Sequence, residues 1–124
     1  MSSLQDKTVL AIDDTAAIRT FLRISLIDQG VDFHEAASAG DGLRKSEELS
    51  PDVIVLDLGL PDRDGLDILP ELKASGEQSP AVVVLTVRSE RQVKEKAMAL
   101  GADAYMTKPF EMEDLVEVME KAVA

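Results

Sequence analysis

The sequence predicts an α/β fold in which helices cover both faces of one parallel sheet. Short apolar segments alternate with amphipathic stretches along all 124 residues. The two strongest segments, residues 53–56 and 82–85, are unbroken runs of Val, Ile and Leu. Unbroken apolar runs are typical of strands buried on both faces of a parallel sheet. Such strands are joined by right-handed helical crossovers.

Five strands are expected, and the second of them has the weakest pattern. In strict alternation with helices they predict a flavodoxin-like, doubly wound (βα)5 sheet in the order 2-1-3-4-5. No internal repeat or linker interrupts the pattern, so residues 1–124 are expected to form one domain. The expected strands are residues 9–12, 31–37, 53–56, 81–85 and 104–106.

Helical spacing of apolar side chains predicts a helix after each strand. Ser38 is a candidate cap for the second helix, which should end near Leu49. Pro70 is expected to bend or shorten the third helix. The fourth is expected to open at Ser89 and to close at Gly101.

Charge and composition exclude several functions. The net charge of −11 argues against direct binding to nucleic acid or to an anionic membrane. It suits a protein that binds a cation or a basic partner. The sequence has no cysteine, which excludes disulfides and thiolate chemistry. No apolar run approaches the roughly 20 residues that span a bilayer, and no signal peptide is expected.

Polar residues follow four of the expected strands. Asp13 and Asp14 follow the first strand, Asp57 the third, Thr86 the fourth and Lys108 the fifth. Because the carboxyl ends of parallel strands meet at one edge of the sheet, these side chains should converge there. Each one alone has an ordinary explanation as a turn residue, helix cap or surface charge. Their conjunction predicts a functional site.

The chemistry of that site follows from its charges. Three carboxylates that lie close together repel one another, and a divalent cation relieves the repulsion. Magnesium prefers oxygen ligands and often bridges to phosphate. His34 is the one histidine, so a zinc ligand set is absent, and a structural role is expected for it. One carboxylate can then accept a phosphoryl group while the metal and a lysine neutralise its charge.

These residues resemble the receiver domain of two-component response regulators along nearly the whole chain. The resemblance implies a phosphoacceptor domain over residues 1–124, of the chemotaxis-type single-domain kind, with no effector domain. It implies a signalling protein rather than an enzyme, although one that takes part in its own phosphorylation and dephosphorylation. The matching segments are residues 9–14, Asp57, the Leu-Pro-Asp-Arg-Asp-Gly loop at 60–65, Thr86 and residues 108–110.

The resemblance implies a role for each residue of the metal and phosphoryl site. Asp57 is expected to be the phosphoacceptor. Asp14 is expected to bind Mg2+ directly, and Asp13 mainly through water. Gly59 matches the position whose backbone carbonyl binds the metal. Lys108 is expected to pair with a phosphate oxygen.

Three further residues match the parts of the family that respond to phosphorylation or shape the site. Thr86 is expected to turn toward the phosphate, and Tyr105 to rotate inward as it does so. Pro109 matches a proline that follows a cis peptide bond from the lysine.

The resemblance also implies partners and a location. The phosphoryl donor would be a histidine kinase or a histidine phosphotransfer protein. The surface of the fourth helix, fifth strand and fifth helix would then bind a downstream protein target. A cytoplasmic protein is expected, without nucleic acid or membrane binding by this chain. The sequence leaves open whether two copies of the chain dimerise through this same surface.

The sequence departs from the family pattern at three positions near the site. Val87 stands where a smaller residue is usual, and Gly59 replaces a polar or bulky side chain. Arg88 either reaches toward the phosphoryl anion or faces solvent. These residues are expected to tune the lifetime of the phosphate rather than to prevent phosphorylation.

Three other functions fit the sequence less well. A small aspartyl-nucleophile phosphatase needs an acid two residues after its nucleophile, but Thr15 follows Asp13 at that distance. A receiver-like adaptor that is never phosphorylated has no need of all three acids and Lys108, so their presence argues against that function. A flavin carrier needs a phosphate loop rich in Ser, Thr and Gly after the first strand, which is absent.

Overall fold

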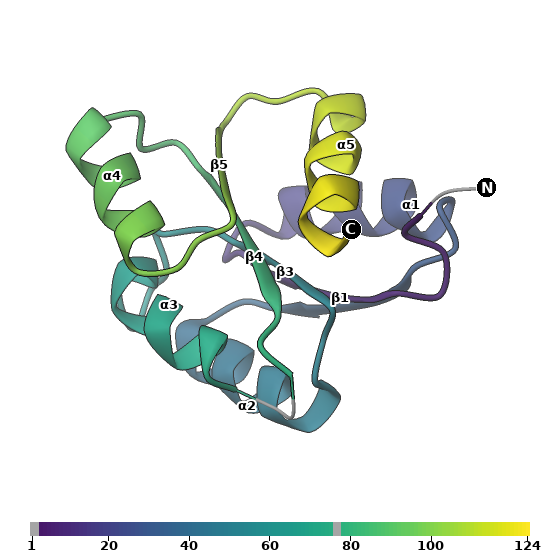
Figure 1. The fold of residues 1–124 in the computed structure, drawn as a ribbon, viewed down its shortest axis with the longest axis horizontal. Coiled ribbons are helices and arrows are strands. Elements are labelled where there is room, and N and C mark those ends of the chain that lie inside the picture. Colours follow the sequence, from purple (N-terminus) through teal and green to yellow (C-terminus); the bar gives the residue numbers. More distant parts are fainter. Residues whose placement is uncertain (1–2, 76–77) are drawn as a thin grey trace.

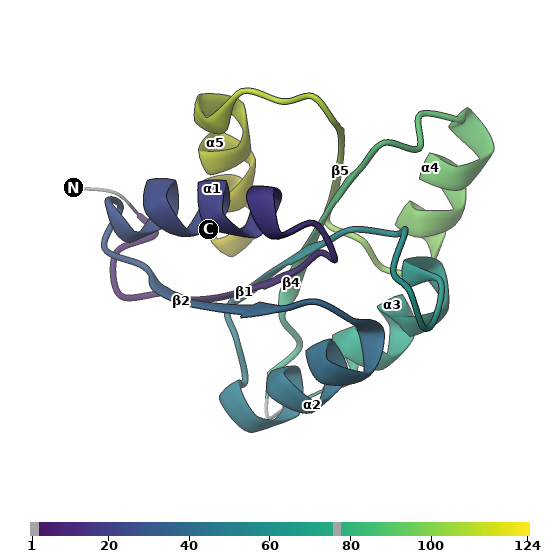
Figure 2. The ribbon, with the colours of Figure 1, turned by 180° about the vertical axis from the view of Figure 1, so that it is seen from behind.

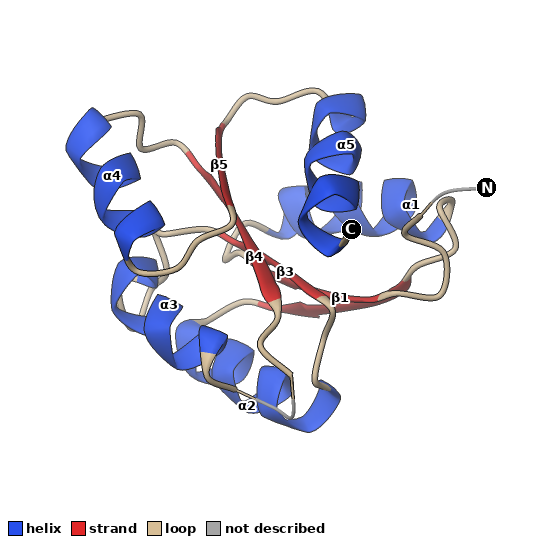
Figure 3. Ribbon diagram, viewed as in Figure 1, coloured by secondary structure: helices blue, strands red, loops and turns tan. Residues whose placement is uncertain are grey.

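The computed structural model describes residues 3–75 and 78–124. Its five strands form one parallel sheet in the order β2-β1-β3-β4-β5, which confirms the predicted topology. Figure 3 shows the sheet in red between two layers of helices. The strands are β1 (Thr8–Ile12), β2 (Asp32–Ala36), β3 (Val53–Leu56), β4 (Ala81–Thr86) and β5 (Ala104–Thr107).

The helices divide between the two faces of the sheet. Helices α1 and α5 cover one face, and α2, α3 and α4 cover the other (Figures 1 and 2). Within the described ranges, no helix is long and apolar enough to span a bilayer. The helices are α1 (Ala16–Ile27), α2 (Ala39–Leu49), α3 (Gly65–Lys73), α4 (Arg91–Ala99) and α5 (Met112–Val123).

The central strands contribute to both hydrophobic cores because successive side chains of a strand point to opposite faces. In β1, Val9 and Ala11 pack toward α1 and α5, whereas Leu10 and Ile12 pack toward α2 and α3. Strands β3 and β4 alternate in the same way, and their side chains are almost fully buried. This two-sided burial is the reason why their sequences are continuous apolar runs.

The structure places the ends of α2 as the sequence predicts. The Ser38 hydroxyl accepts a hydrogen bond from the Asp41 backbone N–H at 3.2 Å, which caps the helix. At the other end α2 stops at Leu49, and Ser50 adopts a left-handed conformation with φ of 45°.

The ends of α3 and α4 agree only in part with the predictions. Helix α3 continues for three residues past Pro70, to Lys73. Helix α4 begins at Arg91, two residues later than expected from Ser89, because the preceding loop is held by contacts with other elements. Gly101 follows the last cap residue with φ of 111°, a conformation that favours glycine.

Strand register brings the ends of β1 and β3 to the same level. Ile12 lies opposite Leu56 in the parallel pairing. The next residue, Asp57, donates its backbone N–H to the Ile12 carbonyl at 2.9 Å. The Lys108 N–H donates in the same way to the Thr86 carbonyl at 2.8 Å, just beyond the pairing of β4 with β5. These bonds fix the backbone from which the site is built.

Gly59 in the β3–α3 loop and Gly65 at the start of α3 have opposite surroundings. A Cβ on Gly65 would lie 2.6 Å from Leu58 Cα and 2.7 Å from the Asp57 carbonyl oxygen, whereas a Cβ on Gly59 would meet nothing within 4 Å. Gly65→Ala should therefore lower the free energy of unfolding by about 1–3 kcal/mol, as overpacking usually does. Gly59→Ala should change it by less than about 0.5 kcal/mol. Urea denaturation of both variants measures the difference, and equal stabilities would contradict the loop geometry.

Candidate functional site

Three carboxylates converge at the carboxyl edge of the sheet. Asp13 and Asp14 follow β1 and Asp57 follows β3, and each offers an oxygen within 4.8 Å of the others. Asp13 and Asp57 are 3% and 7% exposed, whereas Asp14 lies at the surface. Two nearly buried negative charges are costly unless cations compensate them.

Lys108 supplies one such cation. Its Nζ lies 2.8 Å from Asp13 Oδ2 and 3.5 Å from Asp57 Oδ2, so the ammonium group bridges the ends of β1 and β3. Three carboxylates and one ammonium leave an excess of two negative charges when all are ionised. That excess matches one divalent cation. Because all of the acidic ligand atoms are hard oxygens, the residues present fit magnesium.

The position of Asp13 is set by a network that reaches α1 and β2. Its backbone N–H donates to the Ala36 carbonyl, and its Oδ1 accepts from the Thr15 N–H at 2.9 Å. The Arg19 guanidinium donates to the Asp13 carbonyl at 2.8 Å and pairs with Glu35 at 3.0 Å. Sequence reasoning missed Arg19. Its position near the start of α1, a few residues after Asp13 and Asp14, is the sequence feature that indicates a contact with the acid pair.

The loop after Asp57 presents the backbone toward the carboxylates. The Gly59 N–H donates to Asp57 Oδ1 at 3.3 Å, and Gly59 forms an antiparallel bridge with Asp64. The Gly65 N–H closes the loop by donating to the Leu58 carbonyl at 2.8 Å. Gly59 thus lies next to Asp57, and the predicted binding of a metal by its backbone carbonyl stays a prediction.

Thr86 and Tyr105 both contact the backbone of Arg88. Thr86 is 1% exposed, and its hydroxyl accepts from the Arg88 N–H at 3.4 Å. The Tyr105 hydroxyl donates to the Arg88 carbonyl at 2.7 Å. Burial raises the pKa of Tyr105, the negative charge of Glu90 adds to that increase, and Arg88 opposes it. The Tyr105 ring packs half-buried against the core on the α2–α3–α4 side of the sheet, its inward position, and the bond to Arg88 holds it there.

The Arg88 side chain adopts neither of the two positions expected for it. Its Nη1 lies 3.0 and 3.2 Å from the two carboxylate oxygens of Asp64. Asp64 also caps α3, since its Oδ1 accepts from the Leu66 N–H at 2.9 Å. Arg88 therefore joins the β4–α4 loop to the start of α3.

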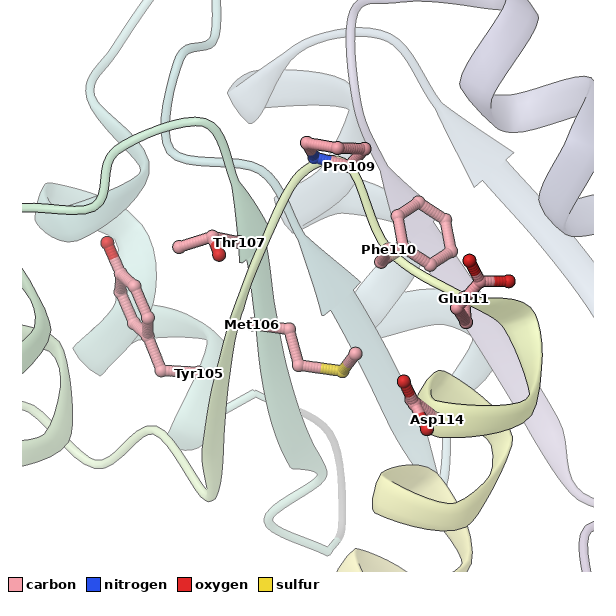
Figure 4. A pocket seen from close by; sticks show the side chains of 7 residues that line it. All are labelled: Tyr105, Met106, Thr107, Pro109, Phe110, Glu111 and Asp114. Carbon is pink, nitrogen blue, oxygen red and sulfur yellow. The ribbon is translucent and has the colours of Figure 1, made fainter.

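Two hollows lie around the segment that joins β5 to α5, and neither is lined by Asp13, Asp14 or Asp57. One, of about 390 Å³, is lined by Val87, which is 72% exposed, and by Lys108, Pro109 and neighbouring apolar side chains. The Lys108–Pro109 peptide bond is cis. Figure 4 shows the second hollow, about 420 Å³, at the junction of β5 and α5. There Tyr105 points away from the side of β5 that carries Met106.

Known proteins similar to this chain share its fold and its sequence pattern. The response regulator receiver domain family matches residues 9–120. The transcriptional regulatory protein KdpE of Mycobacterium tuberculosis is 41% identical over 115 residues, which cover 93% of this chain and 50% of KdpE. The virulence transcriptional regulatory protein PhoP of Salmonella typhimurium is 38% identical over 112 residues, 90% of this chain and 50% of PhoP.

A solved structure agrees with these sequence matches. A response regulator receiver domain protein from Clostridium thermocellum superimposes with a TM-score of 0.85 and 32% identity, covering 94% of each chain. The chain therefore belongs to the response regulator receiver domain family of two-component systems. It spans about half the length of the curated relatives that it matches.

Asp62 is a second structural residue that sequence reasoning did not assign. Its two carboxylate oxygens accept from the Ala39 and Gly40 N–H groups at 2.8 and 2.9 Å, at the start of α2. Hydrogen bonds from Gly40 and Ala39 hold the pKa of the Asp62 carboxyl below its usual value. These bonds connect the β3–α3 loop to the start of α2. The sequence motif at residues 60–65 predicts a loop there, but it does not identify the backbone groups that Asp62 binds.

A depressed pKa in the folded state gives a pH dependence with a known sign. The stabilisation from Asp62 should be complete above the pKa of the unfolded state, about 3.9, and should be lost as the pH falls through the lower folded value. Asp62→Asn should therefore lower the denaturation midpoint at pH 7 and flatten its decline below about pH 4. Urea denaturation between pH 7 and pH 3 measures this. The exposed Asp67→Asn should retain the decline of the original chain, and an equal flattening there would contradict the assignment.

Proposed function

We propose that this chain is a phosphoacceptor whose Asp57 takes a phosphoryl group from a phosphohistidine. The observation that carries the proposal is the position of Lys108, whose ammonium reaches both Asp13 and Asp57 within a cluster of three carboxylates. A cation in that place can neutralise charge on a group transferred to Asp57. Membership of the receiver family supports the same function.

The transfer proposed here conserves atoms and electrons. A carboxylate oxygen of Asp57 attacks the phosphorus of the donor, a new P–O bond forms, and the P–N bond to the donor imidazole breaks. The imidazole nitrogen leaves with the electron pair of that bond and takes up a proton. Hydrolysis of the aspartyl phosphate by water returns Asp57 to its carboxylate and releases inorganic phosphate. Lys108 stabilises the negative phosphoryl oxygens in both steps.

The proposed cofactor is Mg2+, which fits the donors found at the site. Asp13, Asp14 and Asp57 would hold it together with the backbone carbonyl of Gly59, Asp13 mainly through water. When bound, magnesium neutralises negative charge on the phosphoryl group. The residues themselves contribute the preformed cluster, because strand register and Lys108 hold the acids together.

The proposed consequence of phosphorylation is a change at the surface formed by α4, β5 and α5. Thr86 would turn toward the phosphate and Tyr105 would favour its inward position, and a downstream protein would bind the altered surface. The donor would be a histidine kinase or a histidine phosphotransfer protein. Residues 1–124 would act as one receiver domain in the cytoplasm, as a signalling phosphoacceptor rather than as an enzyme.

Phosphorylation is tested by intact mass after incubation with a small acyl phosphate. The original chain should gain one phosphoryl group, because Asp57 is the acceptor. The gain should require Mg2+ and disappear after chelation. Asp57→Asn should gain nothing, since an amide oxygen is a far weaker nucleophile.

Asp67→Asn is the matched control, since it removes one exposed carboxylate elsewhere on the chain. It should gain the phosphoryl group like the original chain. A gain that persists in Asp57→Asn would refute Asp57 as the acceptor. A chain that gains nothing from any donor would instead act as an adaptor.

Gly59 and Val87 are proposed to set the lifetime of the aspartyl phosphate through the access of water. Val87 is largely exposed beside Lys108, and the space next to Gly59 is open. Val87→Ala should speed dephosphorylation and Gly59→Asn should slow it. A barrier change of about 0.7 kcal/mol alters a rate about threefold. Loss of the phosphoryl mass with time gives both rates, and unchanged rates would reject this role.

A further inference from the structure

Arg88, in the β4–α4 loop, contacts the end of β4, the start of α3 and Tyr105 of β5. Its N–H donates to Thr86, its carbonyl accepts from Tyr105, and its guanidinium pairs with Asp64. The N–H, carbonyl and guanidinium of Arg88 therefore contact β4, β5 and the start of α3, respectively. The sequence pattern alone assigned no such position to Arg88.

We infer that the Arg88–Asp64 ion pair is a latch that holds Tyr105 inward before any phosphoryl group is present. The inference extends the proposed function, because it concerns the resting population of the proposed switch residue Tyr105. It does not depend on the acceptor being Asp57.

The latch acts on Tyr105 through the position of a backbone carbonyl. Asp64 is fixed at the start of α3, where its Oδ1 caps the helix and its backbone pairs with Gly59. The ion pair holds the β4–α4 loop to this fixed point, and the loop carries the carbonyl that Tyr105 binds at 2.7 Å. An outward Tyr105 does not make that bond. Loop position and Tyr105 orientation are therefore coupled, and each stabilises the other.

Solvent exposure limits how strongly the Arg88–Asp64 ion pair can favour the inward position of Tyr105. The Arg88 and Asp64 side chains are 32% and 37% exposed, and half-exposed pairs are weak. A latch of that strength shifts the ratio of inward to outward Tyr105 by about fivefold at most. A shift of that size leaves an outward population of Tyr105 on which phosphorylation can still act.

Tyr105 is the single tyrosine of the chain, which also lacks tryptophan, so its ring can be observed without interference. With the tyrosine ring carbons labelled with 13C, NMR reports the inward and outward populations in the absence of any phosphoryl donor. Asp64→Asn keeps a side-chain oxygen to cap α3 and removes the charge. Arg88→Gln keeps the backbone carbonyl and removes the partner cation.

Both variants should lower the inward-to-outward ratio by about three- to fivefold. The double variant should lower it no further than either single variant, because one interaction is removed in all three. Arg88→Lys should recover part of the ratio, since it restores a cation opposite Asp64. Asp67→Asn changes the same charge three residues further along α3, where it is exposed, and should leave the ratio unchanged.

The proposal is overturned if the ratios in Asp64→Asn and Arg88→Gln match that of Asp67→Asn. Additive effects in the double variant would also overturn it. Thermal unfolding followed by circular dichroism shows whether a variant is folded, and Arg88→Gln decides the question should Asp64→Asn unfold. Because every measurement is made without a phosphoryl donor, failure of the latch is distinct from failure of Asp57 as the acceptor.

Discussion

The parallel pairing of β1 with β3 is the constraint on which the whole site depends. Ile12 lies opposite Leu56, so the residues that follow them leave the sheet at the same level. The hydrogen bond from the Asp57 N–H to the Ile12 carbonyl extends that register by one residue and sets Asp57 next to Asp13. A slip of one residue would turn the buried apolar side chains to the opposite faces and would separate the acids. The two hydrophobic cores therefore fix the geometry of the carboxylates as well as the stability of the sheet.

The carboxylate cluster is maintained against its own repulsion by the surrounding fold. Lys108 offsets one charge, and the cores on both faces keep the strand ends in place. Folding has thus brought negative charges together at one point, and the remaining excess would favour a divalent cation there. The same excess disfavours a phosphoryl anion without that cation. In the proposed function, metal binding and phosphoryl transfer would therefore be linked by electrostatics.

Most of the sheet and the carboxylates could be predicted from the sequence because short-range patterns determine them. Buried strands require continuous apolar runs, and the topology rule brings the strand ends together. The partners of Arg88 could not be predicted, since its long side chain has several acceptors within reach and only the folded loops select Asp64. The start of α4 was misplaced for a related reason. Contacts of the preceding loop with Tyr105 and Asp64 outweigh the capping preference of Ser89.

The two regions of the site differ in what their contacts can do. Around Asp13, Asp57 and Lys108 the charged groups are nearly buried and tied to strand ends, so they have little freedom to rearrange. Around Arg88 the contacts are half-exposed and come from loops, so they can exchange at small cost in free energy. A rigid carboxylate cluster beside a weakly held β4–α4 loop suits the proposed function, in which phosphorylation at the cluster would alter the surface of α4, β5 and α5. Because its contacts are weak, the loop needs only a small change in free energy to shift its population.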